Sequence, residues 1–245
     1  MQFFYAGNEF RSNGCPSARY ERNYSKGNPL RWNALAFPLR TADSPVHRPP
    51  PKVRMVTKSL RNAGLRLGYE THFGSIAGLK DGILLEAGFD QTAPNRAVTI
   101  SSWIVQFAAA KKLQYTDNQA RDIPCYNPEY TFVEKVQAVV RKYGQFRATG
   151  KISPNFLRHY YDIHQLLNVE AVQKFIGTPE YLEHKKKRFK SLDQNVGKSG
   201  AFTIEDANIR KQFENEYSKT APLYYRGQIP LDTILARIQI DLPRL

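Results

Sequence analysis

The feature that most constrains the fold is a series of helix patterns that fills the second half of the chain. The first has apolar residues at helical spacing on one face: Phe132, Val136, Val139, Val140 and Tyr143. Thr131 and Glu134 have the spacing of a capping box, in which two side chains satisfy backbone amides of the first turn. Gly144 follows, and glycine commonly ends helices. The pattern predicts a helix over 131–143 that packs by one face.

Four further helices are indicated. A second helix is expected to begin with Ser153 as its cap and Pro154 as its first residue, and to run to about residue 168. Thr178-Pro179-Glu180 predicts another helix start, and residues 205–218 form a fourth helical stretch. A last helix begins at Pro230, with Leu231, Leu235 and Ile238 on one side. We therefore expect a C-terminal helical domain over 129–245.

Residues 61–128 have a different pattern. A short apolar run, Ile83–Ala87, is ended by Gly88 and predicts a buried strand. Extended structure is expected over 98–100, then a short helix over 102–113 and a loop over 114–128, where Pro124 and Pro128 occur. Together with the helices, this predicts an α+β protein. Its sheet is expected to be a partial mixed sheet around residues 65–101.

Residues 1–60 differ again, and we expect them to form an irregular basic arm. They hold seven of the fifteen prolines and ten Lys and Arg against three Asp and Glu. Proline disfavours helix interiors and central strands. The arm could grip nucleic acid, with its aromatic side chains stacking on bases, or it could have no specific role.

The net charge of +14 favours acidic partners, above all nucleic acid or nucleotides. The two cysteines, Cys15 and Cys125, have no zinc-site spacing and suggest no disulfide framework, which is typical of a reducing cytoplasm. No apolar run is as long as the roughly 20 residues needed to span a bilayer. We therefore expect a cytoplasmic protein without a membrane segment.

The predicted helix over 153–168 presents the first candidate site residues. At about 100° per residue, its apolar side chains fall on one side, and Arg158 and Asp162 fall on the other, with His159 at the margin. Arginine is well shaped to clamp a phosphate, and Asp162 could orient that arginine or act as an acid–base group. The alternative is an ordinary surface ion pair between residues four apart, which is worth little stability.

Two more candidates come from other elements. Lys135 lies near the apolar stripe of its helix, so its stem can pack while its ammonium group binds a phosphate, or it can simply reach solvent. Glu86 is a lone carboxylate in an apolar strand, which suits a metal ligand on a rigid element. It could instead point to the open side of a half-exposed strand. The basic run His184–Arg188 is interpreted as a solvated helix face.

Taken together, these segments resemble the AbiEii/AbiGii toxin family of nucleotidyltransferases. The stretch Thr131-Phe-Val-Glu-Lys135 is similar to the third motif of that family. The stretch Arg158-His-Tyr-Tyr-Asp162 is similar to the fourth, and Leu85-Glu86 is similar to the strand that supplies the last metal-binding carboxylate. The resemblance covers about residues 69–240.

The resemblance implies a fold and an activity. Members belong to the DNA polymerase β-like nucleotidyltransferases and are toxins of bacterial toxin–antitoxin and phage-defence systems. They bind a nucleoside triphosphate with Mg²⁺ and transfer a nucleotide, in some members to tRNA, and a cognate antitoxin is expected. By position, Glu86 is implied to hold metal or activate the acceptor, Lys135 to bind phosphate, and Arg158 and Asp162 to position nucleotide and acceptor.

The chain departs from the family in two places: the arm over residues 1–60 does not resemble the family's N-terminal region, and one motif is missing. The family's two other metal ligands lie in an Asp-x-Asp strand after a glycine turn, and this sequence contains no Asp-x-Asp. These departures motivate the hypothesis of an incomplete family member that has lost activity. The alternative function is a non-catalytic basic protein that binds RNA or nucleotide.

Overall fold

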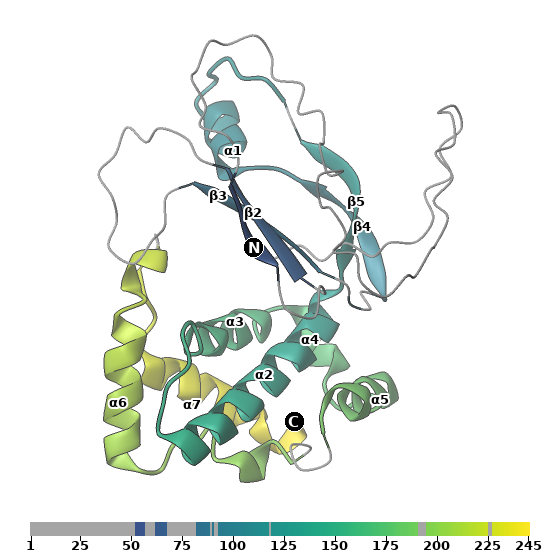
Figure 1. Cartoon of the computed structure of the whole chain (residues 1–245). Helices are drawn as coiled ribbons and strands as arrows, with labels where there is room; N and C mark the ends of the chain where they lie inside the picture. The colour runs from purple at the N-terminus through teal and green to yellow at the C-terminus, as the bar shows by residue number, and fades with distance from the viewer. Residues whose placement is uncertain are drawn as a thin grey trace, which may run out of the picture.

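A computed structural model of the chain describes residues 52–56, 62–67, 82–88, 90, 93–117, 119–190, 195–224 and 227–245. Most of the expected basic arm, residues 1–51 and 57–60, lies outside the described residues. The α+β class is confirmed, because helices and antiparallel strand pairs are both present. In Figure 1 the helices from α2 onward form one body, and the strands with α1 lie on one side of it.

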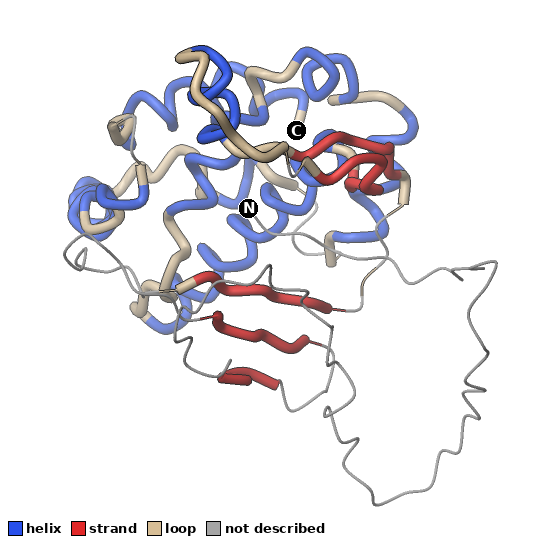
Figure 2. Tube along the Cα trace, turned by 90° about the horizontal axis from the view of Figure 1, so that it is seen from above, coloured by secondary structure: helices blue, strands red, loops and turns tan. Residues whose placement is uncertain are grey.

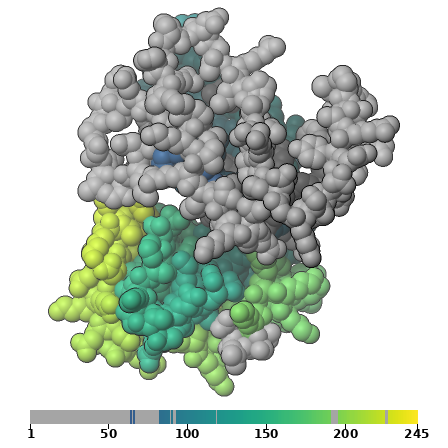
Figure 3. All heavy atoms as spheres, viewed as in Figure 1, coloured from purple at the N-terminus to yellow at the C-terminus, as the bar shows by residue number. Residues whose placement is uncertain are grey.

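The central helix of the body is α2, Pro128–Thr149. All five members of the predicted apolar stripe are buried, from Phe132 at 0% exposure to Tyr143 at 5%. Helices α3, α4 and α5 pack against α2. The space-filling view shows the described residues of the helices from α2 onward packed together at one end of the molecule (Figure 3). Removing a row of large side chains from water on one helix is the main force that fixes its orientation.

The two ends of α2 differ from the prediction. Asn127 is the N-cap residue, and the Thr131 hydroxyl donates to the Asn127 carbonyl, so no capping box forms. The helix continues past Gly144 to Thr149 and ends at Gly150, whose φ is +69°. A glycine within a helix costs only about 1 kcal/mol. The burial of Phe146 on the extra turn offsets that cost.

Helix α3, Arg158–Leu166, begins later than predicted. Ser153 and Pro154 form a turn instead of a helix start, because Asn155 has a left-handed backbone with φ +59°. The predicted apolar face is confirmed: Phe156, Tyr160, Ile163 and Leu167 are all buried. The side-chain pattern therefore identified the face of this segment correctly and its first turn incorrectly.

The remaining helices surround α2 and α3. Helix α5, Pro179–Arg188, has the predicted Thr178 cap, and α6 spans Ala207–Ser218. Helix α7, Leu231–Asp241, follows Pro230 and packs against α3. A short helix α4, Glu170–Phe175, was not expected from the sequence. The described residues also include three 3₁₀ turns: η3 (Gly197–Ser199), η4 (Ala221–Leu223) and η5 (Leu242–Arg244).

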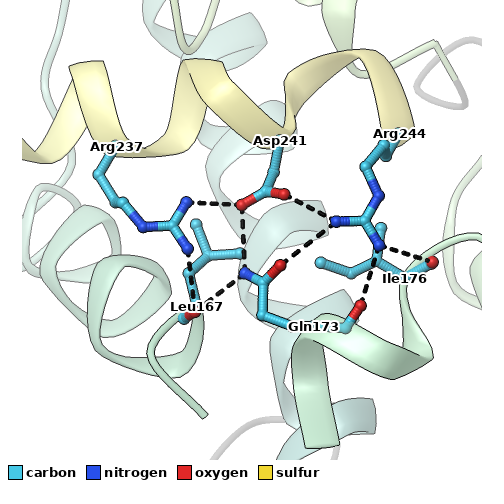
Figure 4. Close-up of polar contacts among 6 residues, drawn as sticks. All are labelled: Leu167, Gln173, Ile176, Arg237, Asp241 and Arg244. Carbon is cyan, nitrogen blue, oxygen red and sulfur yellow. Dashed lines mark hydrogen bonds and ion pairs between the residues drawn. The ribbon is translucent and has the colours of Figure 1, made fainter. Parts of the chain in front are cut away.

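A buried carboxylate joins the end of the chain to the body. Asp241, 4% exposed, accepts hydrogen bonds from Arg237, Arg244 and Gln173 (Figure 4). Burial alone raises the pKa of Asp241, but its partners outweigh burial and hold the pKa below its usual value. The same guanidinium groups donate to the carbonyls of Leu167 and Ile176, so the network ties α7 and η5 to the ends of α3 and α4.

The strands form two antiparallel sheets. The first has the order β1-β2-β3, with β1 Lys52–Val56, β2 Asn62–Leu67 and β3 Ile83–Gly88 (Figure 2). The second pairs β4, Asn95–Ile100, with β5, Ala120–Tyr126. Helix α1, Trp103–Ala110, lies between β4 and β5 in sequence and begins after the Ser102 cap, as expected. The described pairs are antiparallel, whereas a mixed sheet was expected.

Three predictions about the strands were wrong. Strand β1 lies within the arm that was expected to be irregular. Strand β5 occupies the expected loop. Proline has no backbone N–H to donate, and it is tolerated here because each strand of a two-stranded sheet has one unpaired edge. Strand β3 forms as predicted, but Ile83, Leu84 and Leu85 are exposed rather than buried. In the described part of the chain, no helix is long and apolar enough to cross a membrane.

Candidate functional site

The structure brings two of the predicted site residues together. Lys135 on α2 and Asp162 on α3 form an ion pair, with 2.7 Å between Lys135 Nζ and Asp162 Oδ2. Their side chains are 24% and 36% exposed, so the pair is packed yet open to a ligand. These residues are 27 apart in sequence. Only the packing of α2 against α3 makes the contact.

The buried faces of the two helices set this contact. On α2, Lys135 lies between the buried Val133 and Val136, at the margin of the apolar stripe. On α3, Asp162 lies next to the buried Ile163 and two residues after the buried Tyr160. Because each apolar face packs into the core, the charged residues at their margins meet at the rim of the helix–helix contact.

The Asp162 carboxylate is ionised at neutral pH. Burial raises its pKa, but the nearby His159 and Lys135 outweigh burial and hold the pKa below the usual value. His159 Nδ1 lies 3.6 Å from Asp162 Oδ2, too far for a good hydrogen bond, and it is buried without a hydrogen-bond partner among the described residues. Burial lowers the pKa of His159, with Lys135 and Lys142 adding to the effect, so the imidazole is neutral at pH 7.

Arg158 does not have the partner that the helix wheel suggested. Asp162 pairs with Lys135, and no ion pair joins Arg158 to a carboxylate within the described residues. Arg158 is exposed at the first position of α3. Its charge acts on Lys142 of α2, whose pKa it helps to lower. Lys135 and Arg158 therefore both lie within electrostatic reach of Lys142.

Glu86 stands apart from this pair. It is exposed on β3, opposite Gly64 of β2, and no hydrogen bond or ion pair among the described residues joins it to α2 or α3. Across the residues that the structure describes, no three His, Cys, Asp or Glu side chains lie close enough together to hold a metal ion. Asp162, the carboxylate at the pair, is occupied by an ammonium group. The described side chains therefore do not fit a divalent metal by themselves.

A second polar cluster was missed by sequence reasoning. The Tyr126 hydroxyl donates to Glu134 Oε1 at 2.9 Å, and Arg188 lies 2.9 Å from the same oxygen. Arg188 also donates two hydrogen bonds of 3.1 Å to Asp90, and His184 Nε2 lies 3.3 Å from the Tyr126 hydroxyl. Burial raises the pKa of Glu134, and its partners only partly oppose the shift.

This cluster corrects the interpretation of the basic run on α5. His184 and Arg188 face α2 and the β5 end, whereas Lys186 and Lys187 are exposed. The available sequence signal was the four-residue spacing of His184 and Arg188, which places both on one helix face. The cluster joins β5 to the helical body, and it holds Glu134, the residue directly before Lys135.

Comparison with known protein families gives a match that includes both helices of the Lys135–Asp162 pair. The sequence matches the family described as nucleotidyl transferase AbiEii toxin, type IV toxin–antitoxin system, over residues 36–237. This match covers most of the chain, and the protein belongs to that family. Neither the curated proteins nor the solved structures contain a match.

The family assignment confirms the resemblance drawn from the motifs, and it places the chain among nucleotidyltransferase toxins with an antitoxin partner and a nucleotide substrate. The match begins at residue 36, earlier than the resemblance from residue 69. Residues 36–60 of the arm therefore fall within the family region, although the motifs alone had not linked the arm to the family.

Proposed function

We propose that the chain transfers a nucleotide from a nucleoside triphosphate to an acceptor such as tRNA, as a toxin of a type IV toxin–antitoxin system acting in the cytoplasm in phage defence. The observation that carries the proposal is the 2.7 Å contact between Lys135 and Asp162. It unites the two stretches that resemble the family's third and fourth motifs at one partly exposed point.

Lys135 and Arg158 are proposed to bind the phosphates of the nucleotide. Ammonium and guanidinium groups are strong donors to phosphate oxygens, and they stabilise negative charge that grows on a leaving pyrophosphate. In the reaction, an acceptor oxygen bonds to the α-phosphorus while the bond to pyrophosphate breaks. A cation held beside these oxygens favours the transition state more than the ground state.

Asp162 is proposed to position Lys135 and the acceptor. Its lowered pKa keeps the carboxylate charged at neutral pH, so it holds the Lys135 ammonium group in one place. The second carboxylate oxygen can accept a hydrogen bond from an acceptor hydroxyl. Holding both reacting partners in this way reduces the entropy that the reaction must overcome.

Mg²⁺ is proposed to enter with the nucleotide, and Glu86 is proposed as a metal ligand or acceptor-activating group. Nucleotidyltransferases generally use a divalent metal, which neutralises charge on the phosphates. Glu86 is accessible to such a complex because it is exposed on β3. The described carboxylates do not form a complete site for the metal by themselves.

The first test is label transfer from each of the four radiolabelled nucleoside triphosphates to total tRNA, with Mg²⁺ and with a chelator. Asp162→Ala is expected to abolish transfer, because Lys135 loses the carboxylate that positions it. Asp117→Ala is the matched control, since this exposed carboxylate forms its ion pair with the exposed Arg121, away from the Lys135–Asp162 pair. Absence of transfer by the unchanged protein with all four nucleotides would overturn the proposal.

A second candidate function is non-catalytic binding of RNA or nucleotide. The label-transfer assay separates it from the first, because a protein that only binds transfers no label. Non-catalytic binding is favoured by the gathering of cations around a single carboxylate at the pair. It predicts RNA binding that weakens steeply with salt and is unaccompanied by transfer. Binding without salt dependence, or no binding at all, excludes this second function.

A further inference from the structure

A lysine that the sequence motifs do not include extends the Lys135–Asp162 pair along α2. Lys142 lies seven residues after Lys135, which is two helical turns and about 10 Å along the same face. The side chain is half-buried, and its Nζ donates to the Ser153 hydroxyl at 3.4 Å. Ser153 belongs to the turn that precedes α3. The ammonium group is therefore held between α2 and that turn, not free in solvent.

The electrostatic surroundings of Lys142 are one-sided. Burial lowers its pKa first, and the positive charges of Arg141, Arg158 and Lys135 then lower it further. No ion pair links Lys142 to a carboxylate in the part of the chain that the structure describes. Like charges that converge without a counterion destabilise a protein unless an anion binds among them.

His159 gives an independent indication of the same place. The charges of Lys135 and Lys142 both act on its ring, so Lys142 lies within electrostatic reach of the pair. The buried Nδ1 has no hydrogen-bond partner among the described residues. A ligand that brings acceptor oxygens to this point would satisfy such a nitrogen in its N–H tautomer.

We propose that Lys142, Ser153 and Arg158 form a phosphate subsite beside the Lys135–Asp162 pair. The three side chains supply an ammonium group, a hydroxyl whose proton is free to donate, and a guanidinium fork, and all three are donors to phosphate oxygens. The inference deepens the proposed function and rests on it. The phosphate belongs either to the triphosphate of the nucleotide or to the backbone of the acceptor.

The experiment measures binding, so it does not require nucleotide transfer. The full chain is titrated with inorganic tripolyphosphate and, separately, with a single-stranded 20-nucleotide RNA at several salt concentrations. Lys142→Gln is expected to weaken at least one of the two by about tenfold, the loss of one charge-assisted hydrogen bond. If the RNA is the ligand, the slope of log affinity against log salt also falls by about 0.7.

Two further variants separate the subsite from a general charge effect. Lys211→Gln removes the same charge from an exposed position on α6, and it is expected to leave both affinities within about twofold. Ser153→Ala keeps the net charge and removes the hydroxyl that holds Lys142. Ser153→Ala is expected to reproduce part of the loss of affinity seen in Lys142→Gln. Lys142→Arg keeps the positive charge and is expected to retain most of the affinity of the unchanged protein.

The two arms identify the source of the phosphate. A loss confined to tripolyphosphate assigns the subsite to the nucleotide, and a loss confined to RNA assigns it to the acceptor. Unchanged affinity of Lys142→Gln for both probes, an equal loss in Lys211→Gln, or no binding by the unchanged protein at low salt overturns the subsite. Failure of the proposed function is separate, because it appears as absent label transfer while binding remains.

Discussion

At the scale of single residues, partners far apart in sequence decide what each charged group does. Asp162 has Arg158 four residues away, yet its carboxylate pairs with Lys135 of another helix. Glu134 lies beside Lys135 in sequence, but it faces Tyr126 and Arg188 instead. The chemistry of each group therefore follows from the side of the helix on which it lies.

The Tyr126–Glu134 hydrogen bond is expected to contribute measurable stability. Tyr126→Phe leaves the ring in place and removes the donor, so the free energy of unfolding is expected to fall by about 1 kcal/mol. Urea denaturation followed by circular dichroism measures this change. Tyr115→Phe removes a hydroxyl from an exposed tyrosine and is expected to have almost no effect. Equal stability of the two variants would show that the bond contributes nothing.

At the scale of elements, two glycines of α2 have opposite roles. Gly144 lies inside the helix, and a Cβ added there meets no atom within 4 Å. Gly150 ends the helix with φ +69°, a conformation that side chains with a Cβ disfavour. The sequence had assigned the helix end to Gly144, because composition does not tell which glycine adopts the left-handed conformation.

Alanine substitution of these glycines is expected to have opposite effects on stability. Gly144→Ala is expected to raise the free energy of unfolding by about 0.8–1 kcal/mol, since alanine is the better helix former. Gly150→Ala is expected to lower it by roughly 1–2 kcal/mol, since alanine must adopt the left-handed conformation. The midpoint of thermal unfolding of each variant, compared with that of the unchanged protein, measures each effect. The same sign for both would place the helix end elsewhere.

At the scale of the whole molecule, stability is expected to fall as the pH drops below neutral. Burial is the first cause that lowers the pKa of His159, His164 and His184. The folded protein therefore binds fewer protons than the unfolded chain below about pH 6.5. The stability that the neutral imidazoles provide is complete above this pH, and it is lost as the pH falls through their lowered values.

Carboxylates extend this dependence to lower pH. Asp162 and Asp241 have lowered pKa values, so their contribution is present above about pH 3.8 and is lost on further acidification. Glu134 acts in the opposite sense, because its raised pKa makes its contribution fall as the pH rises. Between pH 7.5 and 5.5, the three histidines are expected to destabilise the fold more than Glu134 stabilises it. Urea unfolding at pH 7.5 and 5.5 is expected to show the lower stability at pH 5.5, with a smaller difference for His159→Gln.

The sequence by itself determined most of the helical segments, the buried faces of α2, α3 and α7, and the family to which the chain belongs. Those properties depend on the spacing of apolar residues and on short motifs, which are local. It also identified Lys135 and Asp162 as candidates, because family motifs are contiguous in sequence.

Only the tertiary structure decided which of these residues meet. It paired Lys135 with Asp162, brought Lys142 into contact with Ser153, and left Glu86 exposed on a separate strand. It also turned the expected loop over 114–128 into β5, since a proline is tolerated in a two-stranded sheet. The physical reason is that contacts between elements depend on how whole buried faces pack together, and no local pattern encodes that packing.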